Sequence, residues 1–179
     1  MQNKIWTIGH SNRSMEDFLS LLHENKIGTL ADVRSFPGSR KWPHFNKENL
    51  AVSLEKEKIR YVHIPALGGR RKVKKDSHNT AWRHEAFRGY ADYMESDDFK
   101  KGIAELTAIA KKERTAYMCS EAVWWSCHRS LISDLLKVNG WEVLHIMGKG
   151  KVQEHPYTSA ATIKNGKLSY EENDLFTGN

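Results

Sequence analysis

Strand-like and helix-like segments alternate along this chain, and their order limits its fold more than any other feature. Short runs rich in β-branched and aromatic residues lie at 4–8, 29–33, 60–64, 115–118 and 142–147. Helical hydrophobic spacing is found at 14–26, 46–58, 98–112 and 128–138, and a helical turn is expected at 90–94. Strands that alternate with helices form βαβ units. The sequence therefore predicts an α/β fold, Rossmann-like or flavodoxin-like, with a mainly parallel five-stranded sheet and flanking helices.

Local signals fix both ends of this arrangement. Ser14 stands where an N-cap residue would open the first helix. Near the other end, Asn-Gly at 165–166 is the strongest short hairpin signal, so we predict a β-hairpin appended to the sheet. We expect a single domain over 1–179, with a core at 1–150 and a C-terminal extension at 151–179.

Composition indicates a folded protein with a basic surface. Hydrophobic residues make up 39% of the 179 positions and charged residues 28%, which is typical of a globular domain. The net charge of +6 favours association with phosphates or nucleic acid. The chain has no apolar run near the roughly 20 residues of a membrane helix and no leader-like apolar start, so we expect a cytoplasmic protein without a membrane partner.

Chemically distinctive residues follow the predicted strands. In parallel α/β folds ligands bind outside the carboxyl ends of the strands, so these residues are expected to share one edge. These residues follow the first four predicted strands. They are His10, Ser11, Asp32, Arg34, Ser39, Gly68, Gly69, Arg70 and the loop 119–129. Loops are often polar without a function, so a plain surface edge is the alternative.

The loop 119–129, CSEAVWWSCHR, is the sharpest of these features. It precedes a helix, whose N-terminal amides favour an anion or a thiolate. Cys127 lies at that helix start beside His128 and Arg129, so we expect a lowered pKa and a nucleophilic role, with Cys119 the more buried thiol. The alternative is that both cysteines are packed hydrophobic residues. Arg129 follows Cys119 by ten positions and Cys127 by two, which is not the spacing of phosphatase-type or rhodanese-type enzymes.

A metal site is a weaker possibility. Cys119, Cys127 and His128 could bind zinc or iron together with a fourth ligand such as His10, Asp32 or Glu121. Their spacing matches no standard zinc finger, so we expect no metal and require no cofactor.

Two carboxylates and several aromatic residues suggest a different chemistry. Glu121 and Asp32 could act as the paired carboxylates of glycosidic-bond cleavage. Asp32 and Arg34 lie two apart on one strand face and could also form an ion pair that aims the arginine at a phosphate. Loop tryptophans such as Trp124 could stack on a nucleobase, or could cover an edge of the core.

The ordered motifs of the chain resemble one family along nearly its whole length. The motifs are TIGHSNRSMEDF, ADVRSFPGSRKWPHF, YVHIPALGGRR, FRGYADYM, YMCSEAVWWSCHRSLISDLL and HPYT. They are similar to the bacterial domain-of-unknown-function 488 family. This resemblance implies a grouping and not a reaction. It also implies that the following residues belong to the family's signature: His10, Ser11, Asp32, Arg34, Ser39, Gly68, Gly69, Tyr90, Cys119, Glu121, Cys127, His128 and Arg129.

Three functional hypotheses follow. The leading one is an enzyme acting on a nucleotide, nucleic acid or modified base, with N-glycosidic cleavage as a specific form. The catalytic residues expected are Glu121, Asp32, His10, Cys127 and His128. The residues expected to bind substrate or phosphate are Ser11, Arg34, Ser39, Gly68, Gly69, Arg70, Tyr90, Trp124 and Arg129. The alternatives are a thiol- or metal-dependent redox protein using Cys119 and Cys127, and a non-catalytic nucleic-acid-binding module using the basic segment 70–75.

Overall fold

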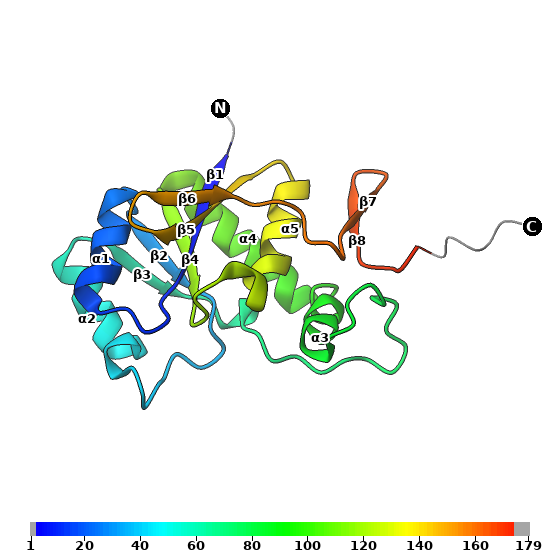
Figure 1. Ribbon diagram of the computed structural model, residues 1–179, viewed down its shortest axis with the longest axis horizontal. Helices are drawn as coiled ribbons and strands as arrows, with labels where there is room; N and C mark the ends of the chain where they lie inside the picture. The colour runs from blue at the N-terminus through cyan, green and yellow to red at the C-terminus, as the bar shows by residue number, and fades with distance from the viewer. Residues whose placement is uncertain (1–2, 174–179) are drawn as a thin grey trace, which may run out of the picture.

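The computed structural model describes residues 3–173 and has a six-stranded sheet as its centre (Figure 1). The strands are β1 (Lys4–Gly9), β2 (Thr29–Asp32), β3 (Arg60–His63), β4 (Thr115–Cys119), β5 (Glu142–Gly148) and β6 (Lys151–Glu154). Their order across the sheet is β3-β2-β4-β1-β5-β6. The first five strands are parallel, and β6 is antiparallel to β5. The predicted α/β class and mainly parallel sheet are therefore confirmed.

Five α-helices and three short 3₁₀ turns connect the strands. The α-helices are α1 (Met15–Glu24), α2 (Lys47–Lys56), α3 (Glu85–Tyr93), α4 (Asp97–Lys112) and α5 (Arg129–Val138). The 3₁₀ turns are η1 (Pro43–Phe45), η2 (Pro65–Leu67) and η3 (Trp124–Ser126). Ser14 caps α1 as predicted, since its side chain accepts a hydrogen bond from the Asp17 amide. Within the described part of the chain, every helix is too short or too polar to span a bilayer.

Two differences from the sequence prediction concern element limits. The sheet has a sixth strand, β6, inside the segment assigned to the extension. All four residues of β6 are exposed, so no alternation of apolar and polar residues marks it as a strand. The helical turn expected at 90–94 is in fact helix α3, which begins earlier because His84 caps it. The predicted C-terminal hairpin is confirmed, with β7 (Thr162–Lys164) and β8 (Lys167–Ser169) joined at Asn165–Gly166.

The sheet has an apolar layer on each face. Helices α1 and α2 cover one face through Phe18, Leu22 and Leu54. Helices α3, α4 and α5 cover the other face through residues such as Phe99 and Leu131. Because side chains alternate along a strand, each central strand contributes to both layers. In β1, for example, Ile5 faces the α5 side and Trp6 faces the α1 side, and Thr7 is the polar member of the α5-side set.

The long segment between η2 and α3 is fixed by one buried carboxylate. Asp92, on α3, accepts hydrogen bonds from the Lys74 amide (2.8 Å), the Ser77 hydroxyl (2.6 Å) and the Asn79 side chain (2.7 Å). These three donors hold the segment, which has no regular structure of its own, against α3. The basic loop 70–75 is thus held near the edge of the sheet where the strands β1 to β4 end.

Candidate functional site

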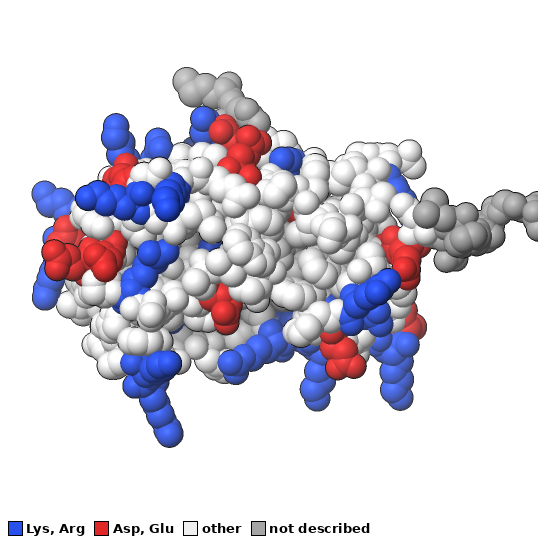
Figure 2. All heavy atoms as spheres, viewed as in Figure 1, with Lys and Arg blue, Asp and Glu red and all other residues white. Residues whose placement is uncertain are grey.

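A cavity of about 1050 Å³ opens at the carboxyl ends of β1, β2, β3 and β4. The residues that the sequence predicted for the site and that line this cavity are His10, Ser11, Arg34, Ser39, Gly69, Arg70, Tyr90, Glu121, Cys127 and His128, together with Cys119. The expectation that strand-end residues share one edge therefore agrees with the geometry. Side chains of Lys and Arg project along the lower edge of the face shown in Figure 2.

Four residues predicted for the site lie outside the cavity lining. They are Asp32, Gly68, Trp124 and Arg129. All four are buried, and each contacts residues of the protein itself. Their positions below correct the direct roles expected for them.

The two thiols are in contact at the inner end of the cavity. The sulfur atoms of Cys119 and Cys127 lie 2.8 Å apart, and both cysteines are free. Cys119 comes directly from the end of β4, and Cys127 comes just before α5. Cys119 is 2% exposed and Cys127 is 7% exposed, so Cys119 is the more buried thiol, as predicted.

Arg129 lies beneath the thiols as their main hydrogen-bond donor. Its Nε atom lies 3.0 Å from the Cys119 sulfur and 3.3 Å from the Cys127 sulfur. Its backbone amide also donates to Cys127, at 3.3 Å. The guanidinium donates further to Thr7 (3.1 Å) and to the Glu121 carbonyl (2.8 Å). With all these partners, and with 1% of its surface exposed, Arg129 serves the sulfurs and does not reach a phosphate in the cavity.

These contacts separate the acidities of the two thiols. Burial alone would raise the pKa of Cys127, but the hydrogen bond from the Cys119 thiol and the Arg129 charge lower it to about 5. Burial and the hydrogen bond to Cys127 raise the pKa of Cys119 well above its usual range. These shifts favour ionisation of Cys127 over Cys119, with the Cys119 S–H as the donor in the contact between the two sulfurs. A lowered pKa at a helix N-terminus beside a cation is typical of reactive cysteines.

Two neutral histidines stand on the cavity wall. His128 donates from Nε2 to the Val33 carbonyl at 2.8 Å, which leaves Nδ1 as an acceptor. His10 bonds through Nδ1 to the Ser11 carbonyl (2.9 Å), and its Nε2 accepts from Arg34 at 3.3 Å. Burial lowers the pKa of both rings, to about 4 for His10. Near neutral pH, each ring therefore presents a proton acceptor and not a cation.

Asp32 orients Arg34 and does not face the cavity. Its carboxylate takes two side-chain hydrogen bonds from Arg34, at 2.9 and 2.7 Å, and one from the Tyr61 hydroxyl at 2.6 Å. The expected ion pair is thus present. The expected pairing of Asp32 with Glu121 for glycosidic cleavage is not supported, because the Asp32 oxygens are already occupied. Glu121 is exposed and lines the cavity, whereas Asp32 does not line it.

Trp124 supports the thiol loop from behind. Its ring stacks on His145 with a centroid distance of 4.7 Å, and its indole N–H donates to Gln153 at 3.1 Å. This tryptophan covers the edge of the core, which was the alternative to base stacking.

Two glycines allow the loops to pass close to one another. A side chain at Gly9 would collide with the Glu121 carbonyl and approach the Arg129 guanidinium. A side chain at Gly68 would collide with Ser35. Gly68 therefore acts through backbone packing, whereas Gly69 lines the cavity opposite His128.

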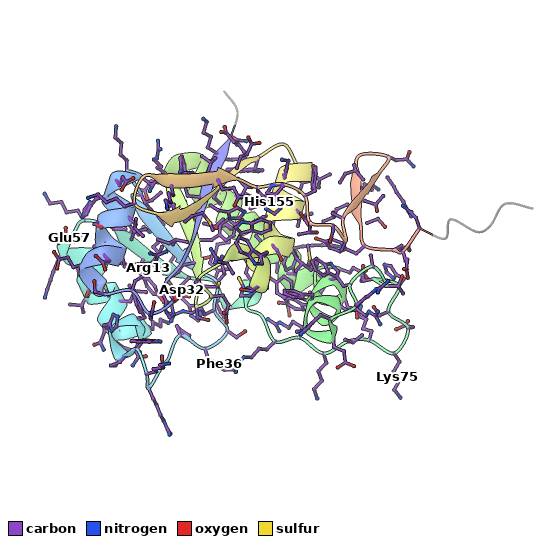
Figure 3. All side chains as sticks on the ribbon, in the orientation of Figure 1. Arg13, Asp32, Phe36, Glu57, Lys75 and His155 are labelled. Carbon is purple, nitrogen blue, oxygen red and sulfur yellow. The ribbon has the colours of Figure 1, made fainter. Side chains whose placement is uncertain are left out.

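The cavity rim contains aromatic and cationic residues that the sequence did not single out. Phe36 is 82% exposed, and Figure 3 shows it at the outer edge, with Asp32 further inside. Lys41 and Phe87 also line the cavity. A Phe directly before the Pro37–Gly38 turn signal was the one sequence feature that could have identified this rim.

The metal alternative has no support in the side-chain arrangement. Among residues 3–173, no cluster of three or more His, Cys, Asp or Glu side chains is suited to a metal ion. His128 uses Nε2 for the Val33 carbonyl, and its Nδ1 faces Gly69, so it does not complete a set with the two sulfurs.

Comparison with known proteins gives one match. A family model described as "Domain of unknown function DUF488" matches residues 14–136. No match was found among curated proteins or among solved structures. The matched range includes β2, β3, β4, the thiol loop and most of α5.

Proposed function

Because this chain belongs to the DUF488 family, whose description names no reaction, we propose its function from the geometry: a thiol-dependent enzyme whose nucleophile is the Cys127 thiolate. The proposal rests on one observation: the sulfurs of Cys119 and Cys127 are in contact, and Nε of Arg129 donates to both of them. The Cys127 sulfur accepts hydrogen bonds from the Arg129 side chain and backbone amide and is in contact with the Cys119 thiol. Such surroundings stabilise a thiolate, and a packed, unreactive cysteine does not require them.

The second thiol suggests dithiol–disulfide exchange as the reaction. The Cys127 thiolate attacks a sulfur of a substrate disulfide, which forms a mixed disulfide and releases the first substrate thiol. Cys119, after losing its proton, then attacks the Cys127 sulfur. This step forms the Cys119–Cys127 disulfide and releases the second substrate thiol. Two electrons pass from the protein to the substrate, and an external dithiol reductant returns the protein to its starting state.

The cavity favours an anionic substrate with a flat or apolar part. Arg70 and Lys41 supply positive charge, and Phe36 and Trp42 supply aromatic surface. Of the residues that the structure describes, Glu121 is the one carboxylate on the lining. An anionic aromatic disulfide, 5,5′-dithiobis(2-nitrobenzoate), fits this description and is also a chromogenic reagent.

That reagent gives a direct test. The reduced wild-type protein should release two thionitrobenzoate ions per chain and end with an internal disulfide. Cys119→Ser should release one ion and retain the other as a mixed disulfide on Cys127, identified by peptide mass spectrometry. Cys127→Ser should react far more slowly. Equal initial rates for Cys127→Ser and the wild type would show that Cys127 is not the nucleophile, and the proposal would fail.

An enzyme acting on a nucleotide or modified base is the second candidate. It is favoured by the exposed Glu121 carboxylate in the same cavity as Trp42 and Arg34. In this function Glu121 would act as a general acid or base, without help from Asp32. Incubation with nucleoside monophosphates and short single-stranded DNA, followed by chromatography for free base, tests it. Release of base that survives Cys127→Ser and disappears in Glu121→Gln would replace the thiol proposal with this one.

A nucleic-acid-binding module rests on the basic loop 70–75. Arg71 is engaged within the protein, since it bonds to the Gly68 carbonyl and stacks on Tyr93, and Lys74 lies near Glu95. Arg70, Lys72 and Lys75 remain exposed at the surface. Binding of single-stranded DNA that weakens steeply with salt, without any product, would favour this function.

A further inference from the structure

A chain of buried hydrogen bonds runs behind the thiol pair, between β1, β5 and α5. The Arg129 guanidinium lies 3.1 Å from the Thr7 hydroxyl, which lies 2.7 Å from Nδ1 of His145. Nε2 of His145 lies 2.9 Å from Nδ1 of His155, and Nε2 of His155 lies 2.8 Å from the Asp134 carboxylate. Thr7, His145, His155 and Asp134 have no exposed surface. Figure 3 shows His155 inside the fold, between β6 and α5.

With one proton on each histidine ring, the donors of this hydrogen-bond network point in one direction, which the Asp134 carboxylate sets because it only accepts. His155 then donates from Nε2 to Asp134 and accepts at Nδ1 from His145. His145 in turn accepts the Thr7 hydrogen at Nδ1, and the Thr7 oxygen accepts from Arg129. The proton of neutral His145 is then on Nε2 and is donated to His155, whose own proton goes to Asp134. These tautomers are assigned from the network. Burial lowers the pKa of His145 to about 2, which is consistent with a neutral ring. A cation thus stands at one end and a carboxylate at the other.

We infer that Thr7, His145, His155 and Asp134 are positioning residues that hold the Arg129 guanidinium against the two sulfurs. The inference rests on the proposed thiol function. The guanidinium is planar, so fixing one of its nitrogens fixes the direction of the others. With one terminal nitrogen held by Thr7 and the other by the Glu121 carbonyl, Nε faces Cys119 and Cys127.

The Asp134 end of this hydrogen-bond network is held in place by residues of the C-terminal extension. Asp134 accepts hydrogen bonds from the Thr158 amide and hydroxyl, at 2.9 and 2.6 Å, and from the Tyr170 hydroxyl at 2.8 Å. These donors lie beyond residue 136, where the family match ends. Trp124, which stacks on His145, connects the same network to the thiol loop. The extension therefore contributes to the site although none of its described residues, 151–173, lines the cavity.

The network also keeps the buried Arg129 cation hydrogen-bonded when the negative charge of Cys127 is lost. In the reduced state the Cys127 thiolate and the Arg129 cation neutralise each other. When Cys127 enters a disulfide, that negative charge is lost and Arg129 stays buried. A buried charge without a partner is strongly unfavourable. The hydrogen-bond chain to Asp134 is polarised toward Arg129 in both states, so the arginine keeps its place throughout turnover.

Thr7→Val tests the inference, with Thr7→Ser as the matched control. Valine has nearly the shape of threonine but removes the acceptor for Arg129 and the donor to His145, whereas serine keeps both. The measurement is the rate of iodoacetamide alkylation of Cys127 against pH, followed by peptide mass spectrometry. The ionisable groups facing this sulfur are Cys119, Arg129, His128, Tyr90 and Tyr117, and both variants leave all of them in place.

We expect Thr7→Val to raise the alkylation midpoint of Cys127 by about one unit, since a misplaced cation loses part of a shift of roughly 1–3 units. Thr7→Ser should restore the wild-type midpoint. His145→Phe keeps an aromatic ring against Trp124 and breaks the chain one step further away, so it should give a shift of the same direction. Because both variants interrupt one chain, the double variant should shift no further than Thr7→Val alone.

Two results would count against different claims. A wild-type midpoint near the ordinary value of about 8.5 would overturn the proposed thiolate itself. A low wild-type midpoint that stays unchanged in Thr7→Val and in His145→Phe, with both variants folded by near-ultraviolet circular dichroism, would leave the thiolate and overturn the positioning network. Fully additive shifts in the double variant would also overturn it, because two independent effects would then be acting.

Discussion

Replacement of Arg129 by methionine is the strongest perturbation of the thiol pair that the structure suggests. Arg129 supplies the nearest positive charge to Cys127, with Nε at 3.3 Å and the backbone amide at the same distance. Arg129→Met keeps the backbone donor and the length of the side chain, and removes the charge. An opposite charge this close lowers an acid's pKa by roughly 1–3 units. The pKa of Cys127, about 5 in the wild type, should rise toward 7.

The effect on reactivity depends on the pH of the assay. At pH 5 the thiolate fraction falls from about one half to about 1%, while each remaining thiolate becomes roughly eightfold more nucleophilic, for a Brønsted coefficient near 0.45. Alkylation should therefore be about sixfold slower than in the wild type at pH 5 and about eightfold faster at pH 9. A rate at a single pH would hide this crossing, so the assay is the full pH profile of iodoacetamide alkylation of Cys127.

Arg13→Met is the control for this experiment. Arg13 also donates to carbonyl oxygens near the site, those of Gly9 and Met147, and it has no bond to either sulfur. Its variant should keep the wild-type midpoint. If Arg129→Met folds and its profile has the same midpoint as the wild type, then the arginine does not set the acidity of Cys127 and the electrostatic argument is refuted.

Three further outcomes are expected from other features. Gly9→Ala should unfold the protein or displace the thiol loop, because the added methyl collides with the Glu121 carbonyl, whereas Gly148→Ala, with open space around it, should change the melting temperature little. Asp92→Asn should lower the free energy of unfolding by about 2–3 kcal/mol, measured by urea denaturation, because a buried carboxylate loses charge-assisted hydrogen bonds. The folded-state pKa of Cys127 is depressed, so its contribution to stability is present at high pH and is lost as the pH falls toward 5. The stability difference between the wild type and Cys127→Ser should therefore shrink from pH 8 to pH 5, by at most about 1.4 kcal/mol per pH unit, and a difference that grows would contradict the depressed pKa.

The sequence predicted the sheet and the place of the site because both depend on patterns along the chain. Strand and helix periodicities are local, and the rule that ligands meet the carboxyl ends of parallel strands then brought His10, Arg34 and Cys127 to one edge. The lowered pKa of Cys127 was also predictable, since this residue lies beside two basic residues at a helix start.

The remaining features depend on contacts between distant segments. Asp32 looked like an available carboxylate, but Tyr61, which helps to occupy it, lies 29 positions away. The network behind the thiols joins Thr7 to His145 across 138 positions. A polar residue inside an apolar strand was the only sign of it, and such a residue does not reveal its partner. Strand β6 was missed because all its side chains face solvent.

The position of β1 in the sheet has a consequence for how the protein is made. β1 leaves the ribosome first, but its two neighbours are β4 and β5, and Gly9 pairs with Cys119. About 110 residues must therefore be synthesised before β1 has a partner, which takes on the order of ten seconds at usual rates of translation. During that time β1, an apolar strand, has no partner strand on either edge. Since Thr7 and Gly9 belong to this strand, the thiol centre is completed only when β1 inserts between β4 and β5, which are synthesised later.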